Sequence, residues 1–129
     1  AAGFRRVEME QAVRVLDGAI RLVDGLEPTR ILAGPGTRLG GADATREVIR
    51  VVYQDPPGRE LWLDQQRVQA LADGERGGGP LGLLPGDTIL APVAGGAQSI
   101  RWLDQHGFLL GLTGYLPADS LRALILRVR

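Results

Sequence analysis

The sequence predicts an α+β domain: an antiparallel sheet of about five to six strands, built from hairpins, with an N-terminal and a C-terminal helix packed on it. Two observations support this fold class. Pairs of extended runs flank short polar turns, and apolar residues recur at helical spacing near both ends of the chain. A length of 129 residues fits one core, so we assign residues 1–129 to a single domain.

The first expected helix covers residues 9–16, where Met9, Val13 and Leu16 recur at helical spacing and Gly18 follows as a stop signal. A short apolar run at 29–33 is expected to form a strand. We expect this strand to end at the chain-breaking residues 34–36, which read Gly-Pro-Gly.

Two hairpins account for most of the expected sheet. Residues 48–54 and 59–65 flank an Asp-Pro-Pro-Gly turn, and residues 98–103 and 108–115 flank an Asp-Gln-His-Gly turn. In the first hairpin, Ile49, Val51 and Tyr53 fall on one face of a strand, while Arg50 and Gln54 fall on the other. One face of the sheet is therefore expected to be core and the other partly wet.

The connection between the hairpins, residues 66–87, is long for a compact domain, so it is expected to be mobile or functional. It has a brief helical pattern at 67–72, and limited proteolysis is expected to cut first between residues 73 and 84. A short strand is expected at 88–91. The closing helix is expected to begin near Pro117 and to bury a stripe that includes Leu121 and Leu124.

Charge and composition exclude several classes of protein. Fifteen basic residues, all arginine, balance fifteen acidic ones, so the chain lacks the net positive charge of a nucleic-acid binder. The absence of cysteine excludes disulfides, thiolate metal sites and thiol nucleophiles. No apolar run approaches the roughly 20 residues of a membrane-spanning helix.

No constellation of residues predicts catalysis, a metal site or a cofactor site. The single histidine, His106, falls in a predicted turn, where a solvated role is expected. Glu60 and Asp64 share one strand face and leave a glycosidase as a competing hypothesis, although such a face is more often simply wet. The glycines at 34, 36 and 40 follow an expected strand, but no helix follows that could hold a pyrophosphate. The chain is therefore expected not to be an enzyme.

The candidate partner-binding residues lie at the end of the first hairpin: Trp62, Gln65, Gln66 and Arg67. Trp62 alternates with core leucines, so it faces either solvent or a covering helix, and tryptophan often anchors interfaces. Trp102 is in phase with Ile100 and is expected in the core.

The last third of the chain resembles the C-terminal extracytoplasmic domains of membrane-anchored anti-sigma factors and related bacterial envelope proteins. The residues that carry the resemblance are Ile100, Trp102, Gly107, Phe108, Leu110, Leu112, Gly114, Leu116 and Leu121, and the helix and first hairpin of the N-terminal half are compatible with it. The histidine and cysteine zinc motif that grips the sigma factor in that family has no counterpart here.

The resemblance implies a non-enzymatic sensor domain outside the cytoplasm of a bacterium, which acts by binding a small ligand or a protein partner at the cell envelope. Its parent protein would be membrane-anchored through a segment upstream. The alternative is a secreted or lipid-anchored binding module of similar fold.

Overall fold

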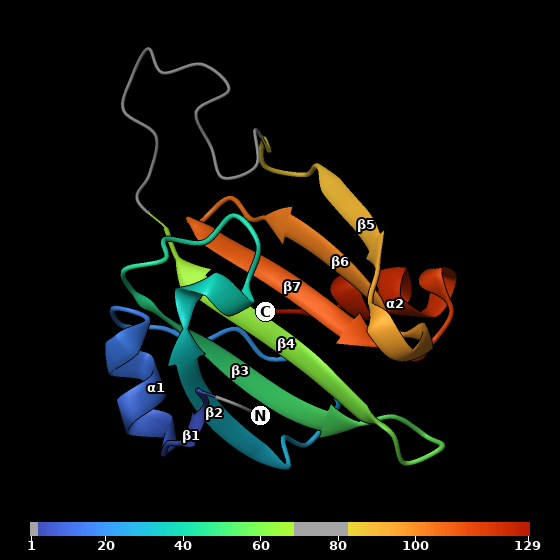
Figure 1. The fold of residues 1–129 in the computed structure, drawn as a ribbon, viewed down its shortest axis with the longest axis horizontal. Helices are drawn as coiled ribbons and strands as arrows, with labels where there is room; N and C mark the ends of the chain where they lie inside the picture. The colour runs from blue at the N-terminus through green and yellow to red at the C-terminus, as the bar shows by residue number, and fades with distance from the viewer. Residues whose placement is uncertain (1–2, 69–82) are drawn as a thin grey trace.

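The computed structural model describes residues 3–68 and 83–129, which form a seven-stranded antiparallel sheet with helices packed on one face (Figure 1). This confirms the α+β class. The spatial order of the strands is β1-β2-β3-β4-β7-β6-β5. Their bounds are β1 Arg5–Arg6, β2 Arg30–Pro35, β3 Glu47–Gln54, β4 Glu60–Arg67, β5 Thr88–Pro92, β6 Gln98–Leu103 and β7 Phe108–Gly114.

Both predicted hairpins are present, and β4 of the first pairs with β7 of the second to join them into one sheet. The strand expected at 88–91 is also present, as β5 on the edge beside β6. A helical turn was expected at 67–72, but its first residue, Arg67, is the last residue of β4. The residues of this segment from 69 on lie outside the described residues. The proteolysis prediction for 73–84 falls almost entirely outside them too.

The predicted end of β2 was wrong by two residues. Gly34 and Pro35 lie inside the strand, paired with Val48 and Glu47 of β3, because the long neighbouring strand supplies partners that the local sequence does not reveal. Pro35 is the last residue of its strand, a position where the missing N–H is tolerated. The two-residue strand β1 was not predicted.

Helix α1 (Met9–Val15) and helix α2 (Ala118–Ile125) both pack on the same face of the sheet, which we call the helix face. The Gln11 side chain accepts a hydrogen bond from the Glu8 N–H at 2.9 Å and so satisfies one donor at the start of α1. Leu16 and Ala12 are buried, but Met9 is 40% exposed, so the predicted apolar stripe is shifted by part of a turn. No helix among the described residues is long and apolar enough to cross a membrane.

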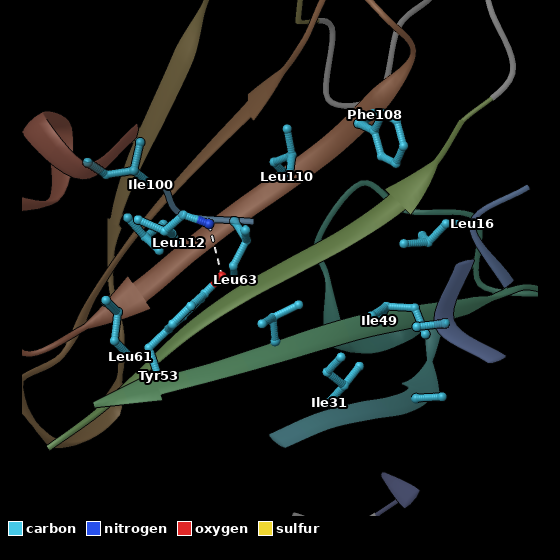
Figure 2. Packing of buried hydrophobic residues seen from close by; sticks show 14 of the residues in the cluster. Leu16, Ile31, Ile49, Tyr53, Leu61, Leu63, Ile100, Phe108, Leu110 and Leu112 are labelled. Carbon is cyan, nitrogen blue, oxygen red and sulfur yellow. Dashed lines mark hydrogen bonds between the residues drawn. The ribbon is translucent and has the colours of Figure 1, made fainter. Parts of the chain in front are cut away.

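The main hydrophobic core lies between the helix face and the two helices. Strand alternation points Ile49, Val51 and Tyr53 into it, as predicted, and Trp102 joins it from β6. Figure 2 shows Ile49 and Tyr53 among the core side chains of β4 and β7, such as Leu63 and Leu112. The Tyr53 hydroxyl accepts a hydrogen bond from the Val23 N–H at 2.9 Å, which ties the connection after α1 to the sheet.

The other face of the sheet is covered by neither α1 nor α2, and we call it the open face. At one end it holds a small apolar cluster that includes Leu39, Val48 and Leu109. The connection between β2 and β3, residues 36–46, crosses this end of the sheet, starting with the short helix η1 (Gly36–Arg38) (Figure 1). The rest of the open face mixes polar groups such as Arg50 and Asp64 with apolar ones such as Val52 and Trp62.

Candidate functional site

The open face holds a cavity of about 240 Å³ that is bounded by the strands below and by the β2–β3 connection on one side. We call it the open-face cavity. It gathers aromatic, hydroxyl, guanidinium and carboxylate groups in one place. Its lining residues are Arg38, Leu39, Gly40, Arg50, Trp62, Asp64, Ala91, Pro92, Val93, Ser99, Arg101, Gly111 and Thr113.

Strand register explains why these side chains meet. One row across the sheet pairs Arg50 with Asp64, Asp64 with Gly111, and Gly111 with Arg101. The adjacent row on the same face pairs Trp62 with Thr113, and Thr113 with Ser99. The Thr113 hydroxyl donates a 3.1 Å hydrogen bond to the Ser99 hydroxyl. Residues from four strands, separated by up to about half the chain, therefore form one polar surface.

The wall formed by the β2–β3 connection is held in place by Gln66. The Gln66 side-chain amide accepts a hydrogen bond from the Asp43 N–H at 2.8 Å and donates to the Asp43 and Arg46 carbonyls at 3.0 and 3.3 Å. Gly36 lets this connection fold back closely, since a Cβ there would lie 2.2 Å from the Asp43 carbonyl oxygen. The wall that carries Leu39 and Gly40 is therefore fixed by bonds to the sheet itself.

A buried ion pair forms the floor of the cavity. Arg50 donates two hydrogen bonds to the Asp64 carboxylate, at 2.7 and 2.9 Å, and the two residues are only 8% and 4% exposed. The Arg50 guanidinium also lies between the Phe4 and Trp62 rings, 4.2 and 4.3 Å from their centroids. Burial raises the pKa of the Asp64 carboxyl, and the bonds from Arg50 oppose that rise.

Trp62 is oriented from both sides. Its indole Nε1 donates a 3.2 Å hydrogen bond to Glu60, while its ring lies against Arg50. Glu60 in turn accepts a 2.6 Å hydrogen bond from Arg30. The bond from Arg30 lowers the pKa of Glu60, with a smaller contribution from Trp62, against the opposing effect of burial. Trp62 therefore presents an aromatic ring of fixed orientation to the cavity, on the face opposite α1 and α2.

Arg101 differs from the other arginines of the cavity floor. Its Nε is buried and has no hydrogen-bond partner, and within the described residues no ion pair engages its guanidinium. The Asp64 carboxylate, one strand beyond Gly111, is already bonded to Arg50. Sequence analysis did not single out Arg101, because on its strand it has the appearance of an ordinary solvated residue.

The four predicted partner-binding residues do not share one surface. Trp62 and Gln66 lie on the open face, whereas Gln65 and Arg67 lie on the helix face, because successive strand residues alternate. Gln65 is fully buried and bonds the Arg21 N–H and carbonyl at 2.7 and 2.8 Å. Arg67 donates to the Leu16 carbonyl at 3.0 Å. Of the four, Trp62 is the one that lines the cavity.

Catalytic groups are sparse around the cavity. Both acids of the glycosidase hypothesis, Glu60 and Asp64, are engaged by arginines. His106 lies in the exposed turn after β6, where its main-chain N–H donates a hydrogen bond to the Asp104 carboxylate. It is not among the described residues that line the cavity. No group of three or more potential metal-ligating side chains occurs among the residues that the structure describes.

A second hollow, of about 350 Å³, lies beside α2, and its lining includes Leu61 of the core and Leu116 and Leu124 from the margin of the core. Its buried carboxylate, Asp55, accepts a 2.8 Å hydrogen bond from the Arg59 N–H and stabilises the β3–β4 turn. Although this hollow is larger, convergent polar groups mark a ligand site better than volume does, so the open-face cavity is the stronger candidate.

Comparisons with known proteins give no relative for the chain: no protein-family model matches it, and no curated protein or solved structure matches it significantly.

Proposed function

We propose that this chain is a non-enzymatic binding domain and that the open-face cavity is its ligand site. The proposal depends on the position of Trp62, an aromatic side chain that Glu60 and Arg50 hold in place at the open-face cavity. Ligand sites typically combine an aromatic or apolar surface with a few fixed polar groups. A sheet face used only for stability would have no need to orient a tryptophan in this way.

The engagement of the acidic groups supports binding over hydrolysis. A glycosidase requires one carboxyl to protonate the leaving group and a second to act as nucleophile or base. Here Asp64 bonds Arg50 through both of its oxygens, and Glu60 bonds Arg30 and Trp62. Release of either carboxylate for chemistry would leave a guanidinium without its partner.

We further propose that the domain acts as the extracytoplasmic sensor of a membrane-anchored, anti-sigma-factor-like regulator. This proposal stands on the sequence resemblance of the last third of the chain, whose Ile100, Trp102 and Phe108 lie in the core. The full reading frame tests it. A membrane helix and a zinc motif upstream would support the regulator, whereas a lipobox or a cleaved signal peptide alone would favour the secreted or lipid-anchored module.

Fluorescence provides a direct test of the ligand site, because the chain has only two tryptophans. The Trp102→Phe variant keeps Trp62 as the sole emitter, and the matched Trp62→Phe variant keeps the core residue Trp102. We expect small molecules from a library of neutral and charged fragments to change the emission of the first variant and to leave that of the second unchanged. Absence of any binder in the cavity, checked by amide chemical shifts of Gly111 and Thr113, would refute the proposal.

A further inference from the structure

The charges around the open-face cavity do not cancel. Three of its lining residues are arginines and one is an aspartate, and Arg38 has an interaction of its own. Arg50 and Asp64 neutralise each other through their paired bonds. Arg101 lines the cavity, and its buried Nε has no hydrogen-bond partner among the described residues. A buried donor without a partner costs free energy, more so when it is charged, so its presence in a folded protein calls for an explanation.

We infer that the open-face cavity takes a small oxyanion, a carboxylate or phosphate group, and that Arg101 is the residue that binds it. This inference rests on the proposed function and specifies the ligand class. A guanidinium presents two parallel N–H groups that match the oxygens of a carboxylate or phosphate, and such charge-assisted bonds are stronger than neutral ones. Arg38 also lines the cavity, from the β2–β3 connection.

The seating of Arg101 leaves one terminal nitrogen of its guanidinium for a ligand. Gly40 lies directly against the other: a Cβ at Gly40 would be 1.9 Å from Nη1 and 4.0 Å from Nη2. Because Nε is buried, Nη2 is the nitrogen that a ligand oxygen can approach. Gly111, next to Arg101 across the sheet, supplies no side-chain acceptor for it, and Leu39 Cδ1 lies 2.9 Å from the place a Cβ there would take.

The size and lining of the cavity restrict the rest of the ligand. The volume of about 240 Å³ lies below the roughly 300–1,000 Å³ of typical small-molecule pockets, so the ligand is small. Trp62, Pro92 and Val93 supply aromatic and apolar surface, and the Ser99 and Thr113 hydroxyls supply short polar contacts. The cavity therefore suits an oxyanion with a short organic body better than a long or multiply charged molecule.

The test uses matched probes on the Trp102→Phe background. Benzoate and benzamide have nearly the same shape but differ in charge, and inorganic phosphate and acetate separate the phosphate and carboxylate sources, with chloride at equal ionic strength as the salt control. We expect at least one oxyanion to bind and benzamide to bind at least about tenfold more weakly than benzoate. Replacement Arg101→Gln should weaken oxyanion binding by at least about tenfold, as the loss of a charge-assisted bond predicts.

Two further variants separate recognition from folding. Gly40→Ala should displace the guanidinium, the flexible end of its side chain, and weaken binding while the urea midpoint changes little. Arg122→Gln on α2, on the far side of the sheet, should leave binding unchanged. Because Arg101 loses no partner among the described residues, Arg101→Gln should be at least as stable as the wild type, whereas a structural role would make it less stable.

The outcomes distinguish the ligand class from the site itself. Equal binding of benzamide and benzoate, full oxyanion affinity in Arg101→Gln, or no binding of any oxyanion probe would each overturn the inference. In all three cases the proposed ligand site would still stand if a neutral fragment changed the Trp62 emission. Failure of the entire fragment library would refute both.

Discussion

The buried pair of Arg50 and Asp64 gives the sharpest stability prediction. Replacement Asp64→Ala removes both bonds to a guanidinium that is only 8% exposed and leaves a buried charge without its partner. Breaking a buried pair from one side costs about 3–5 kcal/mol. The Phe4 and Trp62 rings stay against the cation and retain about 0.5–2 kcal/mol, so we expect a loss near the lower end, about 3 kcal/mol.

This loss converts into a large thermal shift. At about 2.1 cal/mol/K per residue, a chain of 129 residues has an unfolding entropy of about 0.27 kcal/mol/K, so a 3 kcal/mol loss lowers Tm by about 11 °C. Urea unfolding followed by circular dichroism measures the free energy, and calorimetry measures Tm. The control is Asp119→Ala, which removes an exposed ion pair with Arg122 at 3.8 Å and should change stability by no more than about 0.5 kcal/mol.

The double variant Arg50→Met with Asp64→Leu completes the argument. Replacing both partners by apolar side chains leaves no unpaired charge, so its stability should lie well above that of Asp64→Ala and close to that of the wild type. The reasoning fails if Asp64→Ala costs less than about 1 kcal/mol, because the guanidinium would then find water or another partner that a buried site does not offer. It also fails if the losses of the single variants Arg50→Met and Asp64→Leu simply add in the double variant.

Three further predictions concern the surroundings of the cavity. Arg30 lowers the pKa of Glu60, so the contribution of Glu60 to stability is present above its ordinary pKa of 4.5 and is lost as the pH falls through the lowered pKa. The Glu60→Gln variant should therefore show a smaller fall of the urea midpoint between about pH 5.5 and about pH 3 than the wild type. Parallel curves for the two proteins would contradict this. Gln66→Ala should cost about 1–3 kcal/mol and speed amide hydrogen exchange across residues 36–46, since it unbonds Asp43; unchanged exchange there would disprove its role as a support. Gly36→Ala should cost at least about 1–3 kcal/mol in urea unfolding, because the new Cβ would lie 2.2 Å from a main-chain oxygen, and a neutral effect would contradict this close approach.

The hairpins and the core face were predictable because local rules determine them. Alternation with a period of two separates Ile49, Val51 and Tyr53 from Arg50, whatever the rest of the chain does. The turn residues between the strands then determine where each hairpin reverses. Because these features depend only on a few neighbouring residues, they can be predicted from a single sequence.

The face chosen by the helices was not predictable in the same way. Trp62 was expected either in solvent or beneath a helix, and in the structure it lies on the open face against Arg50. Both helices pack on the opposite face, where the contiguous apolar cluster gives them more surface to bury. That choice depends on the summed apolar area of five strands, which appears only after the strand order is known.

The same limit explains why Arg101 was missed. In the sequence it alternates with Ile100 and Trp102 and resembles any polar residue on a wet sheet face. Its distinctive property is that no described residue pairs with its guanidinium: Asp64 bonds Arg50, Gly111 supplies no side-chain acceptor, and Gly40 approaches closely. These three residues come from three separate segments of the chain, so strand order had to be known before the unpaired guanidinium could be recognised.

The division between the two faces also indicates where substitutions will be tolerated. On the helix face, polar groups such as Gln65 and the Tyr53 hydroxyl bond the main chain of neighbouring segments, so each contributes directly to folding. On the open face, Arg101 lacks such a bond among the described residues, and its buried Nε works against stability. Residues that lower stability are concentrated at functional sites, because selection for function retains them despite their cost to folding. Substitution of Arg101 should thus affect binding and leave folding intact, whereas substitution of Gln65 should affect folding first.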